Sequence, residues 1–478
     1  MLKDYIFKSK NNVYLLAFSG IILLFVLFKI PYLSLPFYWD EAWSYAMAVF
    51  DMAQNGPTLL PGHANEWFTR GHPLMYYFLS SSWLKVFGLN LLSAHAFALL
   101  ISVLSLIIIF YVFKHLVNQA SAFIISLAVG VQSMFLSQST MLLPEIFLML
   151  LSVLVFYGYV TKKWYIYIVF SSLLVLSKET GLILILVILF DKIFLSKLFY
   201  WSDIEKNKQF VKEIIILSIP VIVFVTFLLI QKKNLGYFLY PEHIGMTNFE
   251  FRSIKANFIN YSLQLIWNNL RQIWLFIAII SLVIGLVFGK KISKQQVHLL
   301  VLSIIFIIGY LLFSSVNFFT TRYLLTLLPF YFFIVVSLIN YAVDTKIPIV
   351  IVLCTLLVAN FIDSYAKDGE GDCVLTFRET VICHRNAINY CENKGYYNKY
   401  INTGFLMSFN LKYPHLGYLQ GEKRFVNVNK SESPEVYIFY SNEPDSNYEK
   451  VKSDTTYFLE KRFSIKNAWV EIYTKKNI

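Results

Sequence analysis

Charged residues are scarce in this chain. Asp, Glu, Lys and Arg make up 15% of its 478 residues, whereas hydrophobic residues make up 57%; a soluble domain usually has about 25% charged residues. Long uncharged runs, such as residues 15–28 and 299–321, follow one another along the sequence. A helix of about 20 apolar residues crosses the hydrocarbon core of a bilayer and pairs its own backbone groups there. The composition therefore excludes a single soluble domain and predicts a polytopic integral membrane protein.

Several other features are missing. The sequence has no Walker-type or dinucleotide-binding glycine pattern, which argues against a nucleotide site. The first apolar stretch lacks a small-residue cleavage site, so we expect it to remain as the first transmembrane helix. Of only four cysteines, Cys354 lies in an apolar run. Cys373, Cys383 and Cys391 allow either one disulfide with a spare thiol or three separate thiols.

The positive charge is unevenly placed. The formal net charge is +12, and most of it lies in residues 1–364. Lysines cluster in short loops, for example at 162–163 and 290–294, and no basic stripe suited to nucleic acid occurs. Short basic loops of membrane proteins stay in the cytoplasm. We therefore expect a cytoplasmic N-terminus, with the connections 31–71 and 231–264 and the chain after residue 364 outside the membrane.

The apolar runs predict a mainly α transmembrane bundle of about 11–13 helices. A cytoplasmic N-terminus and an external C-terminus require an odd number of crossings, whereas the sequence shows twelve segments. One segment between residues 72 and 138 is therefore expected to lie along the membrane surface or to re-enter. The predicted helices cover residues 13–30, 73–88, 91–113, 119–138, 143–160, 164–177, 180–195, 213–230, 265–288, 297–315, 322–342 and 347–363.

The composition becomes polar after residue 364. Short β-type runs at 435–440 and 468–473 are separated by turn-rich stretches such as 441–446. We therefore expect a transmembrane domain at 1–364 and a small exported α/β domain at 365–478.

Two adjacent carboxylates follow the first apolar helix. Asp40 and Glu41 lie within the aromatic stretch from Tyr38 to Tyr45, directly outside the expected membrane. A carboxylate there could accept the proton of an acceptor hydroxyl as a general base, with its pKa set by burial and by nearby cations. A solvated turn with an acid pair at a helix start is the structural alternative.

Cationic residues occur at other helix ends on the same expected face. Arg70 and His72 precede Pro73, which suits the first turn of a helix, and cations at a helix N-terminus bind phosphate readily. Lys178 interrupts an apolar run, where a charge normally faces a cavity; a mutual Lys178–Glu179 pair in a turn is the alternative. The candidate substrate-binding residues are Arg70, His72, Glu145, Lys178 and Arg322, and His243 is a weak candidate for a metal ligand.

The order of these motifs resembles that of the GT-C superfamily of integral membrane glycosyltransferases. The resemblance is to the branch of the protein O-mannosyltransferases and the lipid A aminoarabinose transferases. Asp40-Glu41 resembles the acid pair of that family's first external loop, and His72-Pro73-Leu74 resembles the motif that opens its next helix. Ser177-Lys178 and Arg322-Tyr323-Leu324-Leu325 are similar to two further family segments.

This resemblance implies a GT-C-type bundle and inverting transfer of a sugar from a polyprenyl-phosphate donor on the external face. It implies that Asp40 is the base, that Glu41 orients the base or the acceptor, and that the cations bind the donor phosphate. In a bacterium the donor lipid would be undecaprenyl phosphate and the location the inner membrane. The acceptor would be an envelope glycan, a lipid or a protein, for example lipopolysaccharide O-antigen or lipid A.

The cofactor and two other functions remain open from the sequence. No cofactor is certain, although a divalent metal ion is compatible with the family. A lipid-linked glycan transporter or flippase would show two related halves with broken helices, and no such symmetry occurs. An O-antigen ligase or polymerase would have an external loop rich in Arg and His, whereas 231–264 offers only Arg252 and His243.

Overall fold

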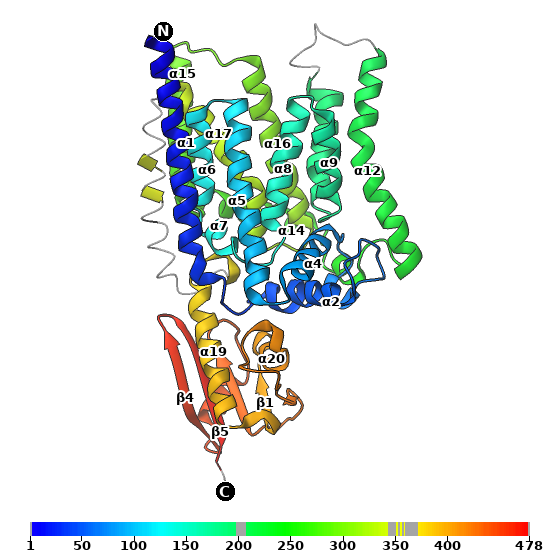
Figure 1. Cartoon of the computed structure of the whole chain (residues 1–478), viewed down its shortest axis with the longest axis vertical. Helices are drawn as coiled ribbons and strands as arrows, with labels where there is room; N and C mark the ends of the chain where they lie inside the picture. Colours follow the sequence, from blue (N-terminus) through cyan, green and yellow to red (C-terminus); the bar gives the residue numbers. More distant parts are fainter. Residues whose placement is uncertain are drawn as a thin grey trace.

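A bundle of long helices and a small sheet domain make up the chain. The computed structural model describes residues 2–196, 207–342 and 371–476, together with residues 350, 351, 354, 355 and 358. The N-terminus lies at one end of the bundle and the sheet domain lies beyond the opposite end (Figure 1). The predicted fold class, a helical membrane bundle with a small C-terminal α/β domain, is confirmed.

The bundle helices differ widely in length. They are α1 (Leu2–Lys29), α4 (Met75–Phe87), α5 (Leu91–Leu116), α6 (Gln119–Gly130), α7 (Ser133–Gln138), α8 (Glu145–Val160), α9 (Trp164–Val175), α10 (Gly181–Phe190), α12 (Asn207–Leu235), α14 (Phe251–Trp267), α15 (Arg271–Val287), α16 (Lys294–Val316) and α17 (Leu328–Ala342). Shorter elements at the ends are α2 (Met47–Asn55), α3 (Glu66–Thr69), α13 (Pro241–Gly245) and the turn η6 (Thr321–Leu327).

Six of the described helical segments are long and apolar enough to cross a membrane. The chain is therefore a multi-pass membrane protein. The six segments are Val13–Tyr32, Leu91–Leu116, Gln209–Leu235, Phe251–Val287, Lys294–Val316 and Thr321–Ala342.

The segment predicted as a helix at 73–88 forms α4, which is too short for a straight crossing. Its 13 residues give a length of about 20 Å, against about 30 Å of hydrocarbon. It lies beside α2 at the end of the bundle that faces the sheet domain (Figure 1). The predicted helix 347–363 lies almost entirely outside the described residues.

The predicted helix 119–138 is interrupted, and this prediction is corrected. Gln132 has an extended backbone (φ −67°, ψ 132°) and separates α6 from α7. Its side-chain oxygen accepts a hydrogen bond from Arg271 Nη1 at 2.8 Å, and Arg271 Nη2 also donates to the Gln264 carbonyl at 2.8 Å. The last carbonyls of a helix lack backbone partners. The buried Arg271 side chain supplies hydrogen-bond donors to such carbonyls at the end of α14, before α15 begins. The predicted helix 265–288 accordingly begins only at Arg271.

The second long connection, predicted as 231–264, is largely helical. Helix α12 continues to Leu235, and α13 and most of α14 cover the rest, apart from residues 236–240 and 246–250. Polar residues such as Arg252 and Asn257 interrupt the apolar run of α14. For this reason the apolar pattern did not predict a helix here. Asn257 Nδ2 donates to the Ser315 carbonyl at 3.1 Å and joins α14 to the end of α16.

The sheet domain has one five-stranded mixed sheet in the order β2-β1-β3-β5-β4. Strand β1 is parallel to β2 and β3, whereas β5 is antiparallel to β3 and β4. The predicted β-type runs form β3 and β5, and Cys373, Cys383 and Cys391 are separate buried thiols. The elements are β1 (Tyr400–Thr403), β2 (Asn427–Val428), β3 (Val436–Tyr440), β4 (Tyr457–Ile465), β5 (Ala468–Lys475), α19 (Phe377–Asn393), α20 (Phe405–Lys412) and α21 (Tyr448–Ser453).

The sheet domain contacts the segment that follows α1. Phe37 N donates to the Leu416 carbonyl at 3.0 Å, and the Tyr418 hydroxyl donates to the Phe37 carbonyl at 3.0 Å. Asn442 Nδ2 donates to the Tyr38 hydroxyl at 3.0 Å. The predicted domain boundary at 364–365 lies outside the described residues. These contacts fix the carboxylate-bearing segment between the bundle and the sheet.

Close packing of α8 on α9 gives a test of the fold. A Cβ atom at Gly158 would lie 2.6 Å from Tyr167 N, which is backbone and cannot rotate away. We expect Gly158→Ala to lower the unfolding free energy by about 1–3 kcal/mol. Gly20→Ala is the matched control because a Cβ there meets nothing within 4 Å. Thermal unfolding in detergent measures both variants, and equal stability would contradict this packing.

Candidate active site

Asp40 begins a short helical turn after α1. The turn covers Glu41–Ala46, and the preceding Trp39 has a left-handed backbone with φ of 52°. Asp40 Oδ1 accepts a hydrogen bond from Trp43 Nε1 at 2.9 Å, and Oδ2 contacts Arg322 Nη2. The Asp40 side chain retains 22% exposure. It is therefore both held in place and accessible.

Glu41 has a different environment from its neighbour. Its side chain is 2% exposed. Oε1 accepts from Leu142 N at 2.6 Å and contacts His95 Nε2 at 3.1 Å, while Oε2 accepts from Tyr38 N at 3.2 Å. His95 Nδ1 lies 3.0 Å from the Leu33 carbonyl, which can only accept. The alternative of a solvated acid pair is therefore wrong. The buried Glu41 carboxylate links three parts of the chain through its contacts with Leu142, His95 and Tyr38.

Arg322 lies at the centre of three carboxylates. Besides Asp40, its Nη1 contacts Asp372 Oδ2 at 2.7 Å and its Nε lies 3.4 Å from Glu145 Oε1. Arg322 is 3% exposed, Glu145 1% and Asp372 4%. Because a buried charge is costly without a partner, these groups stabilise one another. The carboxylates come from the segment after α1, the start of α8 and the turn before α19.

Lys178 completes this charge cluster. Its Nζ lies 3.0 Å from Glu145 Oε1 and 3.9 Å from the centre of the Tyr323 ring. The structural alternative, a mutual Lys178–Glu179 pair, is wrong, because Glu179 instead contacts His72 Nδ1 at 2.9 Å. The two neighbours thus point to different partners.

A second polar group surrounds His72. The rings of His72 and His243 lie 4.8 Å apart, and Arg70 Nη2 forms an ion pair with Glu242 at 2.9 Å. Arg70 also lies 5.2 Å from the Trp43 ring. Within the described ranges, no three His, Cys, Asp or Glu side chains gather in a group that could hold a metal ion. His243 thus has no metal-ligating set among those residues.

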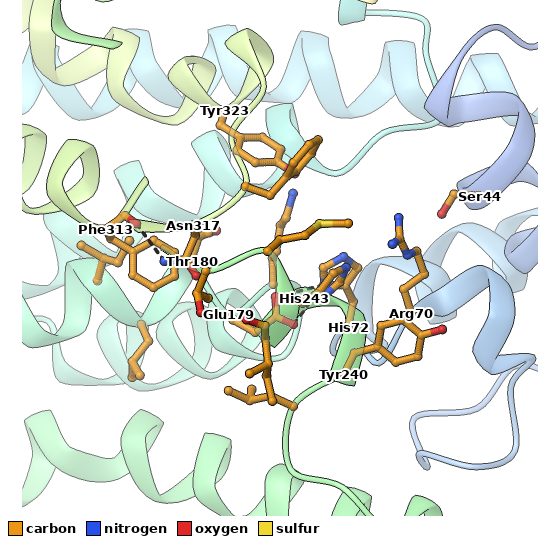
Figure 2. Close-up of a pocket in the computed structure, with 18 of the residues that line it drawn as sticks. Ser44, Arg70, His72, Glu179, Thr180, Tyr240, His243, Phe313, Asn317 and Tyr323 are labelled. Atoms are coloured by element: carbon orange, nitrogen blue, oxygen red, sulfur yellow. Dashed lines mark hydrogen bonds and ion pairs between the residues drawn. The ribbon is translucent and has the colours of Figure 1, made fainter. Parts of the chain in front are cut away.

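One cavity of about 390 Å³ is lined by several of these residues, among them Asp40, Arg70, His72, Lys178 and Arg322. Figure 2 shows His72, His243 and Glu179 close together, with Arg70 and Tyr240 on one side and Phe313 and Asn317 on the other. The remaining wall is apolar and comes from α10, α12 and α16. Its residues include Leu182, Ile183, Leu186, Phe224 and Phe313. The cavity therefore joins a charged end to an apolar wall inside a helical bundle.

The surroundings shift the acidity of the extramembrane groups. Burial alone would raise the pKa of Asp40, but Arg322 and the Trp43 hydrogen bond outweigh it and hold this pKa below its usual range. Burial raises the pKa of Asp372 despite the opposing charge of Arg322. Burial also opposes ionisation of Glu179, yet His72 lowers its pKa to about 2. Asp40 is therefore ionised at neutral pH.

Comparison with known proteins agrees with this architecture. Residues 71–230 match the family model for dolichyl-phosphate-mannose-protein mannosyltransferases. The whole chain superposes on ArnT from Cupriavidus metallidurans bound to undecaprenyl phosphate, with a TM-score of 0.54, 11% identity and coverage of 95% of this chain and 98% of that one. The chain has the GT-C fold. The apo state of the same ArnT gives a TM-score of 0.53 at 11% identity and the same coverage. No curated protein sequence matches the chain significantly.

The GT-C resemblance that the motifs indicated is thus confirmed. The cavity brings together most of the candidate residues, but Glu41 and Glu145 lie outside its lining. Glu145 contacts the lining residues Lys178 and Arg322, whereas Glu41 contacts Leu142, Tyr38 and His95, which do not line the cavity. Sequence reasoning missed Asp372, His95 and the roles of Trp43 and Tyr323. Asp372 had no local signal, whereas Tyr323 directly follows Arg322. The candidates that line the cavity are Asp40, Arg70, His72, Lys178, Arg322 and His243.

The buried contacts of Glu41 predict a structural effect of its removal. Glu41→Ala leaves Leu142 N, Tyr38 N and His95 Nε2 without an acceptor in a buried site. We expect a loss of about 2–4 kcal/mol of unfolding free energy. Glu432→Ala, at an exposed glutamate of the sheet domain, is the control for losing a carboxylate. Thermal unfolding of the purified variants measures the difference, and a wild-type midpoint for Glu41→Ala would contradict the assignment.

His243 predicts a pH dependence of stability. Burial, and then the charge of His72, lower its pKa from 6.5 to about 4. Between these pH values the unfolded chain binds a proton that the folded chain does not, so stability falls as the pH falls through this window. His243→Asn should reduce this acid destabilisation by roughly 1 kcal/mol after allowing for solvent screening. Thermal unfolding across the window measures it, with the exposed His63→Asn as control; equal pH dependence in both variants would argue against it.

Proposed function

We propose that the chain is an inverting glycosyltransferase that moves a sugar from a polyprenyl phosphate to an acceptor at the membrane surface. The observation that carries the proposal is the position of the Asp40 carboxylate, which Arg322 and Trp43 hold in a cavity that is also lined by basic side chains and by an apolar wall. A lipid-linked sugar needs both parts of such a cavity. A binding module would need no accessible carboxylate fixed in this way.

The cavity suits the chemistry of the donor. The side chains of α10, α12 and α16 offer an apolar surface for the first isoprene units. Arg70, His72 and Lys178 line the same cavity and can stabilise the charge on the departing phosphate. The solved ArnT of the same fold is bound to undecaprenyl phosphate, which supports a donor of this class.

Asp40 is proposed as the general base. In an inverting displacement the acceptor oxygen attacks the anomeric carbon from the face opposite the leaving group, and a carboxylate takes its proton. The low pKa of Asp40 keeps it ionised and ready to accept this proton. Glu41 acts indirectly, since its three buried contacts fix the backbone on which Asp40 is carried.

The donor lipid, the membrane and the acceptor are proposed from the family resemblance. For a bacterial chain we propose undecaprenyl phosphate as the donor lipid, the inner membrane as the location and an envelope glycan or lipid, such as O-antigen or lipid A, as the acceptor. The cytoplasmic N-terminus and the external sheet domain belong to the same proposal. The proposed reaction includes no step through a metal ion.

Envelope glycan profiling by mass spectrometry tests the function. A strain lacking the gene is complemented with the wild type, Asp40→Asn or Asp51→Asn. Asp51 is the matched control because it lies on α2, outside the lining of the cavity, and its carboxylate accepts a hydrogen bond from Asn55. We expect one sugar to be lost in the deletion and in Asp40→Asn, with a fall in activity of at least about 100-fold, and to be restored by Asp51→Asn.

Two other outcomes would count against the proposal. Full modification by Asp40→Asn would exclude Asp40 as the base. An unchanged glycan profile in the deletion strain, with no accumulation of lipid-linked sugar, would contradict the transferase function as a whole. Membrane levels of each variant are measured in parallel so that lost protein is not mistaken for lost catalysis.

A further inference from the structure

The first described residues of the sheet domain reach into the charged cluster. Asp372 lies in the turn η7 (Gly371–Cys373), immediately before α19. Its carbonyl accepts from Ser137 Oγ at 2.8 Å and from Gln138 Nε2 at 3.0 Å, and its Oδ2 accepts from Arg322 Nη1 at 2.7 Å. Both ends of the residue are thus held by the helical bundle. The contacts of Ser137 and Gln138 with the Asp372 carbonyl already anchor the domain. The additional contact between the Asp372 carboxylate and Arg322 is not needed for anchoring.

The carboxylate of Asp372 controls how Arg322 is presented to Asp40. A guanidinium group is planar and its N–H bonds point in fixed directions. With Nη1 bound to Asp372, Nη2 is directed to Asp40 and Nε toward Glu145. Without Asp372, the guanidinium could rotate, and its charge would be shared by two carboxylates rather than three.

We propose that Asp372 is a positioning residue for sugar transfer, which orients Arg322 and limits its hold on Asp40 so that Asp40 remains an effective base. This inference deepens the proposed function and rests on it. Asp372 does not line the cavity, so it acts through Arg322 and not on the substrate. It also gives the sheet domain a role in the reaction, because the first described turn of that domain, η7, supplies the residue.

Asp372→Asn tests the inference with little change in shape. The amide oxygen can still accept from Arg322, but the negative charge is lost. As the pH falls, Asp372 loses its charge before Asp40 does, because burial raises the pKa of Asp372 whereas that of Asp40 is lowered. The acid limb of the wild-type pH–kcat profile should therefore follow Asp372, and in Asp372→Asn it should move down by about 0.5 pH unit or more, towards the titration of Asp40. The altered hold on Asp40 should lower kcat by roughly ten- to 100-fold with little change in KM.

Membranes from the deletion strain serve as the probe, since they contain both the accumulated donor and the unmodified acceptor. Purified full-length protein is added, and sugar transfer is followed by mass spectrometry across the acid range. Asn442→Ala is the matched control: it removes a sheet-domain contact with Tyr38 but does not touch Arg322. Asn442→Ala is expected to keep the wild-type acid limb, and Asp372→Glu, which retains the charge, should keep it with a lower kcat.

The outcomes separate the inference from the function on which it rests. If the wild type transfers sugar and Asp40→Asn does not, a wild-type acid limb in Asp372→Asn overturns the inference alone. An equal shift in Asn442→Ala also overturns it, because general loosening of the sheet domain would then suffice. If Asp372→Asn does not reach the membrane, wild-type kcat in Asp372→Glu overturns it. Absence of transfer by the wild type overturns the proposed function and this inference together.

Discussion

The contacts of one guanidinium group join the distant parts of this chain around the cavity. Arg322 binds Asp40, which is 282 positions away in sequence, together with Glu145 and Asp372. These residues belong to four segments that meet only in the folded protein. Because each charge would be costly to bury alone, the fold and the cluster depend on each other. The site is thus a consequence of the packing and also part of what fixes it.

The helical bundle could be predicted from the sequence, and so could two motifs of the site, Asp40-Glu41 and His72-Pro73-Leu74. Uncharged runs locate most helices, since a charge in the hydrocarbon core is costly, and this signal is local. This signal failed for an apolar run that forms only a short helix and for a long helix that contains polar residues. The apolar run at α4 was long enough to suggest a crossing, whereas Arg252 and Asn257 hid α14, and nothing nearby indicated that Gln132 would pair with Arg271.

The candidate site shows the same division between local and distant information. Asp40, His72 and Lys178 were identified because each lies beside an apolar run, where a polar side chain can serve as a base, bind phosphate or face a cavity, and because their motifs resemble those of a known family. Their partners could not be found this way. A mutual Lys178–Glu179 pair was one of two interpretations of Lys178, yet Lys178 pairs with Glu145 and Glu179 pairs with His72. Asp372 lies in a polar region where an aspartate is unremarkable by composition, so only the folded chain indicates its contact with Arg322.

The balance of charge supports a division of labour across the cavity. Around Arg322 and Lys178 stand three carboxylates, so this cluster has no spare positive charge for a phosphate when all are ionised. Arg70 and His72 stand apart from it, each paired with one carboxylate, Glu242 or Glu179. Inverting transfer needs the base and the leaving group on opposite faces of the sugar. Two separate charged groups in one cavity meet that need: the base is held among carboxylates, and the phosphate is left to cations whose partners lie nearer the surface. On this argument, Lys178 contributes less to phosphate binding than Arg70 does. Its partner Glu145 is 1% exposed, whereas Glu242, the partner of Arg70, is 53% exposed, so solvent screens the second pair more strongly.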